Sequence, residues 1–267
     1  MKTLIVTGAA SGIGRAAAKF YAQKGWSVGM IDLPGDRLMA AREEVQALAV
    51  EGATIVADGA DLAVSDQVIA ACRTMQSQLG TPDILMNNAA SRAGMGWKAS
   101  REEWRSLFEV NFWAIVDTVD FFMPFMLQKR GAKIVNVGSK QGITNPPGHP
   151  IYNISKSALK TYTEALEHDL RSAKEEQTLS AHLLVPGWTT TGDREHQPGA
   201  WLPEQVVERM DAALQNGDFY IICPDDEVSE DMDKRRIAWG AGDMIENRPP
   251  LSRWHPAYKE EAAKACD

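Results

Sequence analysis

The chain of 267 residues, with 44% hydrophobic and 24% charged residues, has the size and composition of one large globular α/β domain. Its formal net charge of −8 argues against general affinity for nucleic acid or anionic membranes, and no apolar run approaches the ~20 residues of a membrane helix. Because the first residues lack a signal peptide's apolar core and the three cysteines form no Cys-x-x-Cys pair, we expect a reducing, cytoplasmic setting.

Short apolar segments alternate along the chain with longer segments that carry apolar residues every three or four positions. Expected strands cover residues 2–7, 27–32, 53–57, 82–87, 133–138, 179–185 and 219–223. Expected helices run from the glycine cluster to residue 24, over about 34–50, 65–79 and 101–129, through Tyr152 to about 174, and over about 203–215. Pro124 predicts a kink or break. This alternation predicts an α/β fold with a Rossmann-like, doubly wound parallel sheet of about seven strands and helices on both faces.

No internal repeat, low-complexity segment or linker divides the chain, so residues 1–267 are predicted to form a single Rossmann-like domain. Residues 191–216 begin with a polar, glycine-containing segment, and we expect them to form a lid over the substrate that orders on binding. Residues 225–267 form a polar extension after the last expected strand. We expect this extension to wrap a neighbouring subunit or to close the pocket.

A glycine cluster stands where the first strand turns into the first helix. Gly8, Gly12 and Gly14 have the spacing Gly-x-x-x-Gly-x-Gly. Glycine permits a tight turn there and lets backbone N–H groups approach a pyrophosphate, which a helix N-terminus favours electrostatically. The position of the cluster between strand and helix therefore predicts a dinucleotide site.

Asp32 ends the second expected strand, where a carboxylate can accept both hydroxyls of an adenosine ribose and would repel a 2′-phosphate. A helix N-cap or turn acid is the alternative reading of this residue. Neither Ser11 nor Leu33 supplies a positive charge for a 2′-phosphate, and we expect Arg37 to point to solvent. These residues favour NAD over NADP.

Tyr152 and Lys156 are four residues apart, so in a helix their side chains project from one face about one turn apart. A free phenol, with a pKa near ~10, is a poor base at neutral pH, but a nearby ammonium lowers that pKa. The pair predicts a proton-transfer device, although a half-buried tyrosine beside a surface lysine has the same spacing. Ser139 follows the strand at 133–138, where α/β proteins place reacting groups, so its hydroxyl could hold a substrate oxygen.

Seven motifs occur in order along the first 191 residues. They are Thr7-Gly8-x-x-x-Gly12-x-Gly14, Asp61-Leu62, Asn87-Asn88-Ala89, Asn111, Ser139, Tyr152-x-x-x-Lys156 and Pro186-Gly187. With these motifs the chain resembles the short-chain dehydrogenase/reductase family, NAD(P)-dependent oxidoreductases with a single Rossmann-like domain. Ala90 departs from the pattern, because it stands where the family usually has glycine.

The resemblance implies catalytic roles for four residues. Tyr152 would be the general acid/base, and Ser139 would hydrogen-bond the substrate oxygen. Lys156 would lower the pKa of the tyrosine and bind the hydroxyls of the nicotinamide ribose. Asn111 would support a water that links Lys156 to solvent.

The resemblance also implies a cofactor groove. Asp61 would contact the adenine edge with Leu62 beside it, Asn88 would line the groove, and Thr189 and Thr191 would hold the carboxamide of the nicotinamide. The complete cofactor-binding set implied is Gly8, Ser11, Gly12, Ile13, Gly14, Asp32, Asp61, Leu62, Asn88, Tyr152, Lys156, Pro186, Gly187, Thr189 and Thr191.

Aromatic residues are frequent in the segments expected around the substrate, and the chain has eight tryptophans. The candidate substrate-binding residues are Trp97, Gln141, His149 and Trp188. An aromatic-lined pocket would suit an apolar or aromatic secondary alcohol or its ketone, whereas tryptophans that pack a core or a subunit interface are the alternative. His149 also fits a solvent-facing loop, and Lys140 and Gln141 fit either a polar substrate group or a solvated loop. No cluster has metal-ligand spacing, so we predict no catalytic metal.

These features predict an NAD-dependent short-chain alcohol dehydrogenase or ketone reductase that transfers a hydride between nicotinamide and a secondary alcohol or ketone. A non-catalytic NAD-binding regulatory protein and a lyase or epimerase on the same scaffold are the alternatives. The complete catalytic set disfavours a regulatory protein. The short region after the sixth strand disfavours a lyase or epimerase, because it leaves little room for a sugar-nucleotide domain. We further expect a small-molecule substrate, a homodimer or homotetramer, and no nucleic-acid or membrane partner.

Overall fold

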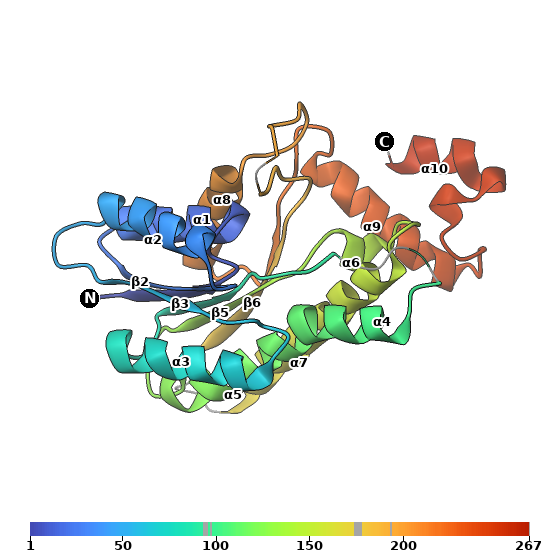
Figure 1. Cartoon of the computed structure of the whole chain (residues 1–267). Helices are drawn as coiled ribbons and strands as arrows, with labels where there is room; N and C mark the ends of the chain where they lie inside the picture. The colour runs from blue at the N-terminus through green and yellow to red at the C-terminus, as the bar shows by residue number, and fades with distance from the viewer. Residues whose placement is uncertain (93–95, 97, 174–177, 193, 267) are drawn as a thin grey trace.

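A seven-stranded parallel sheet lies at the centre of the computed structural model, which describes residues 1–92, 96, 98–173, 178–192 and 194–266 (Figure 1). The strands are β1 (Thr3–Thr7), β2 (Ser27–Asp32), β3 (Ile55–Gly59), β4 (Ile84–Asn87), β5 (Lys133–Val137), β6 (Ser180–Val185) and β7 (Tyr220–Ile222). Their order across the sheet is β3-β2-β1-β4-β5-β6-β7, and every neighbouring pair is parallel. The predicted Rossmann-like fold is confirmed.

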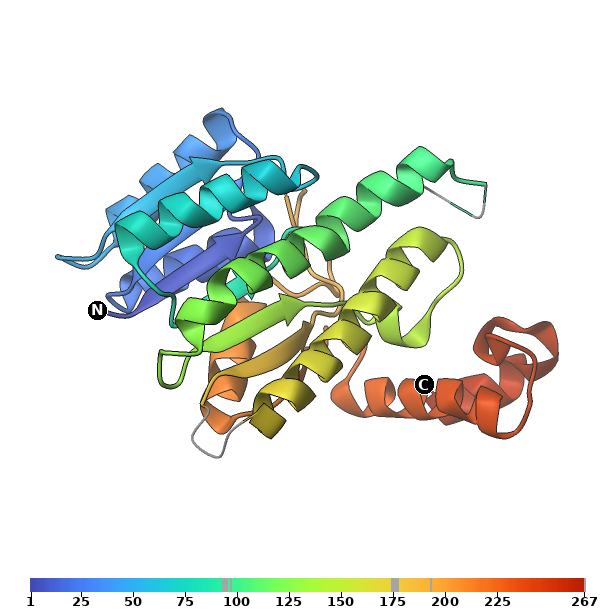
Figure 2. The same cartoon turned by 90° about the horizontal axis from the view of Figure 1, so that it is seen from below.

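Helices cover both faces of the sheet (Figures 1 and 2). One face carries α1 (Gly12–Gln23), α2 (Asp36–Leu48) and α8 (Pro203–Asn216). The other carries α3 (Ser65–Leu79), α5 (Ala114–Met126) and α7 (Pro150–Ala173). The part of the predicted lid that forms α8 therefore packs on the body of the protein, since Val206, Val207 and Met210 are buried in its core.

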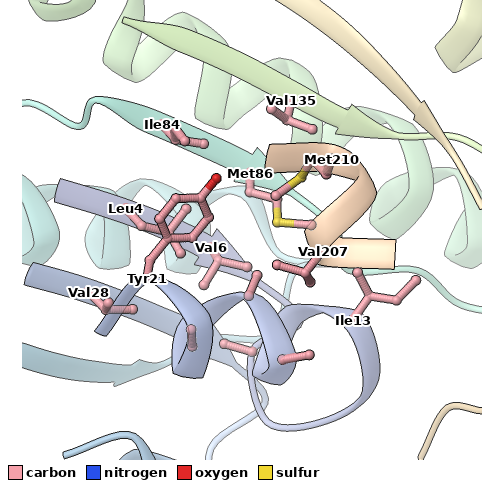
Figure 3. Packing of buried hydrophobic residues seen from close by; sticks show 14 of the residues in the cluster. Leu4, Val6, Ile13, Tyr21, Val28, Ile84, Met86, Val135, Val207 and Met210 are labelled. Carbon is pink, nitrogen blue, oxygen red and sulfur yellow. The ribbon is translucent and has the colours of Figure 1, made fainter. Parts of the chain in front are cut away.

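Successive residues of each central strand belong to opposite cores. Leu4 and Val6 of β1 pack under α1, whereas Ile5 packs among the helices of the other face. Figure 3 shows the first of these cores, where Val207 and Met210 of α8 meet the side chains of β1 and β4. Because both faces are covered, the strands are continuous apolar runs rather than alternating ones.

The expected long helix at 101–129 is three consecutive segments: α4 (Arg101–Phe108), a π-helical turn η1 (Glu109–Trp113) and α5. A capping box starts α4, in which Ser100 Oγ accepts the Glu103 N–H at 3.2 Å and Glu103 accepts the Ser100 N–H at 2.6 Å. Pro124 lies near the end of α5 without breaking it. The irregularity is instead the π-helical turn, which the apolar periodicity did not predict.

The C-terminal extension is helical, with α9 (Glu230–Ile245), short 3₁₀ turns η2 (Ser252–Trp254) and η3 (Pro256–Tyr258), and α10 (Lys259–Cys266). Both views place it at the end of the molecule remote from the N-terminus (Figures 1 and 2). Trp239, Ala262 and Cys266 form a separate small core there, and Trp239 Nε1 donates to Ser252 Oγ at 2.8 Å. Across the parts of the chain that the structure describes, no helix is long and apolar enough to cross a membrane.

Candidate functional site

A cleft of about 710 Å³ opens at the carboxyl ends of the strands. This is where an α/β sheet places ligands, because loops from neighbouring strands diverge there. Sixteen of the predicted site residues line the cleft: Gly8, Ser11, Gly12, Ile13, Asp32, Asp61, Leu62, Asn88, Ser139, Tyr152, Lys156, Pro186, Gly187, Trp188, Thr189 and Thr191. The fold thus brings the sequence motifs together in one place.

The glycine turn between β1 and α1 has no room for side chains. Gly8 and Gly12 have positive φ angles of 68° and 53°. A Cβ atom on Gly14 would lie 2.2 Å from Gly8 O and 2.6 Å from Asn88 Nδ2. Asn88 fixes the turn, since its Nδ2 donates to Thr7 O at 3.0 Å and to Gly8 O at 3.2 Å. These contacts make a cradle into which a pyrophosphate fits, with the backbone of α1's first turn facing it.

Gly14→Ala is expected to destabilise the protein by roughly 1–3 kcal/mol, because α1 must move away from the Gly8 carbonyl. Urea unfolding measures the change. Gly240→Ala in α9 is the control, since a Cβ atom there meets nothing within 4 Å, and alanine in an open helix position should stabilise by about 0.5–1 kcal/mol. Equal stability of the two variants would contradict the close packing of the turn.

Acidic residues lie at the β2–β3 end of the cleft. Asp32 accepts the Ala10 N–H at 2.8 Å and the Leu33 N–H at 2.7 Å, so its carboxylate is held beside the glycine turn. Asp61 accepts the Ala63 N–H at 2.9 Å. Arg37, expected to point only to solvent, is exposed but also lines the cleft from the first turn of α2. A positive charge therefore stands in this end of the cleft together with the two carboxylates.

Tyr152 and Lys156 lie on one face of α7, and the fold buries both. Lys156 Nζ donates to Val137 O at 2.7 Å and lies 5.8 Å from the centroid of the Tyr152 ring. Ser139, two residues beyond β5, lies close enough to the phenol to lower its pKa, and its Oγ accepts the Gln141 N–H at 3.2 Å. The surface-lysine alternative is therefore wrong, since Lys156 is only 2% exposed.

The charges around Tyr152 favour its phenolate. Burial raises the pKa of Tyr152, but the positive charges of Lys156 and Arg92 and hydrogen bonds with Ser139 and Arg92 outweigh burial, so the pKa lies below its ordinary value. Burial lowers the pKa of Lys156 as well, with the tyrosine opposing that change. A phenol with a depressed pKa beside an open cleft is suited to exchange a proton with a bound ligand.

Asn111 lies behind the cleft in the π-helical turn and is completely buried. Its Nδ2 donates to Ser91 O at 3.0 Å and to Ser155 Oγ at 3.1 Å, and its Oδ1 accepts the Ser91 N–H at 2.7 Å. The residue therefore ties the segment after β4 to α7. π-Helical turns are frequent at functional sites, because the extra residue redirects backbone groups.

Some predicted residues lie outside the cleft lining. Gly14 underlies the glycine turn, Gln141 begins the short helix α6 (Gln141–Thr144), and His149 is an exposed residue just before α7. Trp97 is outside the described residues. The cleft also includes Arg92, which the sequence analysis missed, although a basic residue four positions after Asn88 was a visible signal.

No group of three or more His, Cys, Asp or Glu side chains suitable for a metal ion occurs within the described ranges of the chain. Cys72, Cys223 and Cys266 are buried.

Comparisons with known proteins agree with the geometry. The model of the short chain dehydrogenase family matches residues 2–198. A CLA biosynthesis dehydrogenase/reductase from Lactiplantibacillus plantarum is 28% identical over 91% of this chain and 96% of its own length. A 1-deoxy-11-beta-hydroxypentalenate dehydrogenase from Streptomyces exfoliatus is 35% identical over 71% of this chain and 68% of its own.

The solved structures include a short-chain dehydrogenase/reductase from Burkholderia phymatum in complex with NAD. It has a TM-score of 0.82 and 28% identity, and the match covers 93% of this chain and 96% of that one. A metagenomic short-chain oxidoreductase in complex with NADP matches with a TM-score of 0.69 and 24% identity over 83% of this chain and 96% of that one. The fold, the cleft at the strand ends and the family match together establish that this chain belongs to the short-chain dehydrogenase/reductase family of NAD(P)-dependent oxidoreductases.

Proposed function

We propose that the protein oxidises a secondary alcohol with NAD, or reduces the corresponding ketone, with Tyr152 as the general base and acid. The supporting observation is the buried phenol that reaches the cleft between the Ser139 hydroxyl and the Lys156 ammonium. In oxidation, Ser139 would hold the substrate oxygen and the Tyr152 phenolate would accept the hydroxyl proton. In reduction, the Tyr152 O–H would return that proton to the oxygen of the ketone.

The nicotinamide cofactor, when bound, supplies the hydride acceptor or donor. Lys156 would bind the ribose hydroxyls of that cofactor and stabilise the phenolate, and Asn111 would hold a water on the proton path behind Lys156. The glycine cradle would take the pyrophosphate, while Asp61 and Leu62 would lie at the adenine. Ser11, Ile13, Asn88, Pro186, Gly187, Thr189 and Thr191 complete the proposed cofactor set.

NAD is the preferred cofactor in this proposal, because the Asp32 carboxylate would accept the ribose hydroxyls and repel a 2′-phosphate. Arg37 is the opposing feature, since its guanidinium lines the same cleft. The solved relatives include complexes with either cofactor. The balance of these two charges therefore decides the preference of this chain.

The proposal is tested with purified protein, NAD⁺ or NADP⁺, and a panel of apolar, aromatic and carboxylate-bearing secondary alcohols, by the absorbance of the reduced cofactor. We expect turnover with NAD⁺ and a kcat/KM for NAD⁺ at least about tenfold above that for NADP⁺, since one unfavourable charge contact costs about 1.4 kcal/mol or more. Asp32→Ala should shift the ratio towards NADP⁺. A wild-type preference for NADP⁺ would overturn the cofactor assignment, and absence of turnover with bound NAD⁺ would favour a regulatory role.

The substrate would have an apolar or aromatic body. Trp188 lines the cleft and is 45% exposed, so its ring is available to pack against a ligand. The Streptomyces exfoliatus relative is named for a hydroxylated substrate, which agrees with alcohol chemistry.

We also propose a homodimer or homotetramer and a cytoplasmic location. Trp113 at the end of η1 and Phe125 of α5 are exposed apolar residues on the long helices, where a second copy would cover them. The three cysteines form no disulfide with one another, which agrees with a reducing compartment.

A further inference from the structure

Arg92 is a cation at the reaction end of the cleft. It follows β4 by five residues, and the preceding Ser91 is fixed by the hydrogen bonds of its backbone N–H and C=O groups to Asn111. The guanidinium carbon lies 5.0 Å from the centroid of the Tyr152 ring, and its positive charge lowers the pKa of the phenol. The side chain is exposed and lines the cleft, so a ligand that reaches the phenol also reaches Arg92.

Charge is distributed unevenly along the cleft. Among its described lining residues the only carboxylates are Asp32 at the end of β2 and Asp61 after β3, and Arg37 lies with them. The other charged residues of the lining are Arg92, Lys156 and Arg194, all of them basic. Ser139 follows β5, three strand positions from β2, which corresponds to about 14 Å across the sheet. The reaction end holds the Lys156 ammonium and the Arg92 guanidinium around one phenol. A chain with a net charge of −8 therefore presents a locally positive surface where the substrate reacts.

We propose that Arg92 binds a carboxylate of the substrate, so that the chain acts on hydroxy acids and oxo acids in preference to neutral alcohols and ketones. This inference rests on the proposed function and names its substrate class. A guanidinium presents paired N–H donors in one plane, which matches the two oxygens of a carboxylate. The carboxylate would then be bound within one side-chain length of the carbon whose oxygen Tyr152 and Ser139 would contact.

Arg92 has a second effect that the experiment must separate from binding. Because it contacts the phenol, its removal alters Tyr152 for every substrate, charged or neutral. Recognition of a carboxylate, in contrast, affects only substrates that carry one. The two effects separate in a comparison of acids with uncharged analogues of the same shape.

The experiment uses matched pairs, each an acid and its amide, with aromatic, short alkyl and long alkyl bodies. β-Hydroxy-β-phenylpropanoate and its amide form the aromatic pair. Equilibrium binding to the enzyme saturated with NADH is followed by tryptophan fluorescence, for which Trp188 is a reporter in the cleft. In at least one pair the acid should bind about 10- to 100-fold more tightly than the amide. This factor is the usual contribution of hydrogen bonds between charged groups to affinity.

Arg92→Met should abolish this difference between acid and amide, and Arg92→Lys should retain part of it because the charge remains. Arg171→Met, which removes an exposed arginine from the far end of α7, should retain all of it and controls for net charge. KM in turnover should show the same pattern, with kcat changed equally for both members of a pair.

Acids that bind no better than amides in any pair, or an advantage that survives Arg92→Met, would overturn the inference. Failure of the proposed function is a separate outcome. In that case acids would bind with the Arg92-dependent advantage, but no alcohol would reduce NAD⁺.

Discussion

Tyr152→Phe is expected to lower kcat for alcohol oxidation by about 10²- to 10⁴-fold, the usual contribution of general acid–base catalysis. The ring stays in place in this variant, because Tyr152 is 6% exposed and packs with Leu107 and Ile151. Only the hydroxyl that contacts Ser139 and Arg92 is removed. Stability and the Kd for NADH should therefore change little, and the loss should appear in the chemical step.

Tyr162→Phe provides the matched control on the same helix. Tyr162 is half-buried, its ring packs 5.8 Å from that of Phe112, and burial raises the pKa of its phenol to about 12. Because this hydroxyl lies outside the cleft lining, its removal should leave kcat within about twofold of wild type. The measurement is initial-rate NADH formation at saturating substrate. A Tyr152→Phe enzyme as active as Tyr162→Phe would remove Tyr152 from the mechanism.

The pH profile gives an independent reading of the same group. Only the phenolate accepts a proton, so the rate of alcohol oxidation should rise with pH and level off above the pKa of Tyr152. That pKa lies below the ordinary value of about 10, because the charges of Lys156 and Arg92 and the hydrogen bonds to the phenol outweigh burial. The residual rate of Tyr152→Phe should lack this dependence.

Lys140→Met is expected to destabilise the protein by about 3 kcal/mol, the low end for breaking a buried ion pair. Lys140 Nζ lies 3.3 Å from Asp225 Oδ2 and 2.7 Å from Asp233 Oδ2, and the two carboxylate side chains are 3% and 6% exposed. Asp225 also accepts the Trp188 N–H at 2.9 Å. Removal of the ammonium would leave two adjacent carboxylates buried between the segment after Ser139, the Trp188 loop and α9.

Neutralising one of the two carboxylates should restore part of the stability that Lys140→Met loses. Burial raises the pKa of Asp233, and Lys140 opposes this rise. The double variant Lys140→Met/Asp233→Asn therefore removes a buried negative charge that has lost its counter-charge. Lys160→Met is the control, because its ion pair with Glu164 is about one-third exposed and should be worth about 0.5 kcal/mol. Urea unfolding measures all three. A Lys140→Met cost as small as that of Lys160→Met would show that the buried cluster contributes little to stability.

The sheet and the cleft could be predicted because their signals are local. Each strand is a short apolar run, and several motif residues, among them Gly8, Asp32 and Ser139, stand at or just after the end of a strand. In a parallel sheet these ends meet at one edge, so Gly8, Asp32 and Ser139 converge without any knowledge of packing. Tyr152 and Lys156 could also be placed together from the sequence, because residues four apart in a helix lie on the same face.

The remaining features depend on contacts between distant segments. Lys140 finds its partners 85 and 93 residues further along the chain, so a solvated loop was an equally valid reading of the sequence. The π-helical turn at 109–113 has the apolar content of an ordinary helix, and the hydrogen bonds of Asn111 to Ser91 and Ser155 that accompany it are tertiary. The position of Arg92 after Asn88 signals a basic residue near the cleft, but the contact of its side chain with the Tyr152 ring is tertiary and could not be predicted from the sequence.

Because β1 lies between β2 and β4, the two halves of the sheet are synthesised one after the other. Strands β1 to β3, together with Gly8, Asp32 and Asp61, are complete within the first 61 residues, whereas Ser139, Tyr152 and Lys156 follow much later. Chains emerge from the ribosome N-terminus first, at about 5–20 residues per second. The residues of one half of the cleft are therefore synthesised several seconds before the proton-transfer residues. The remaining edge of β1 is the one with which β4 pairs, so that β5, β6 and β7 can then be added in chain order.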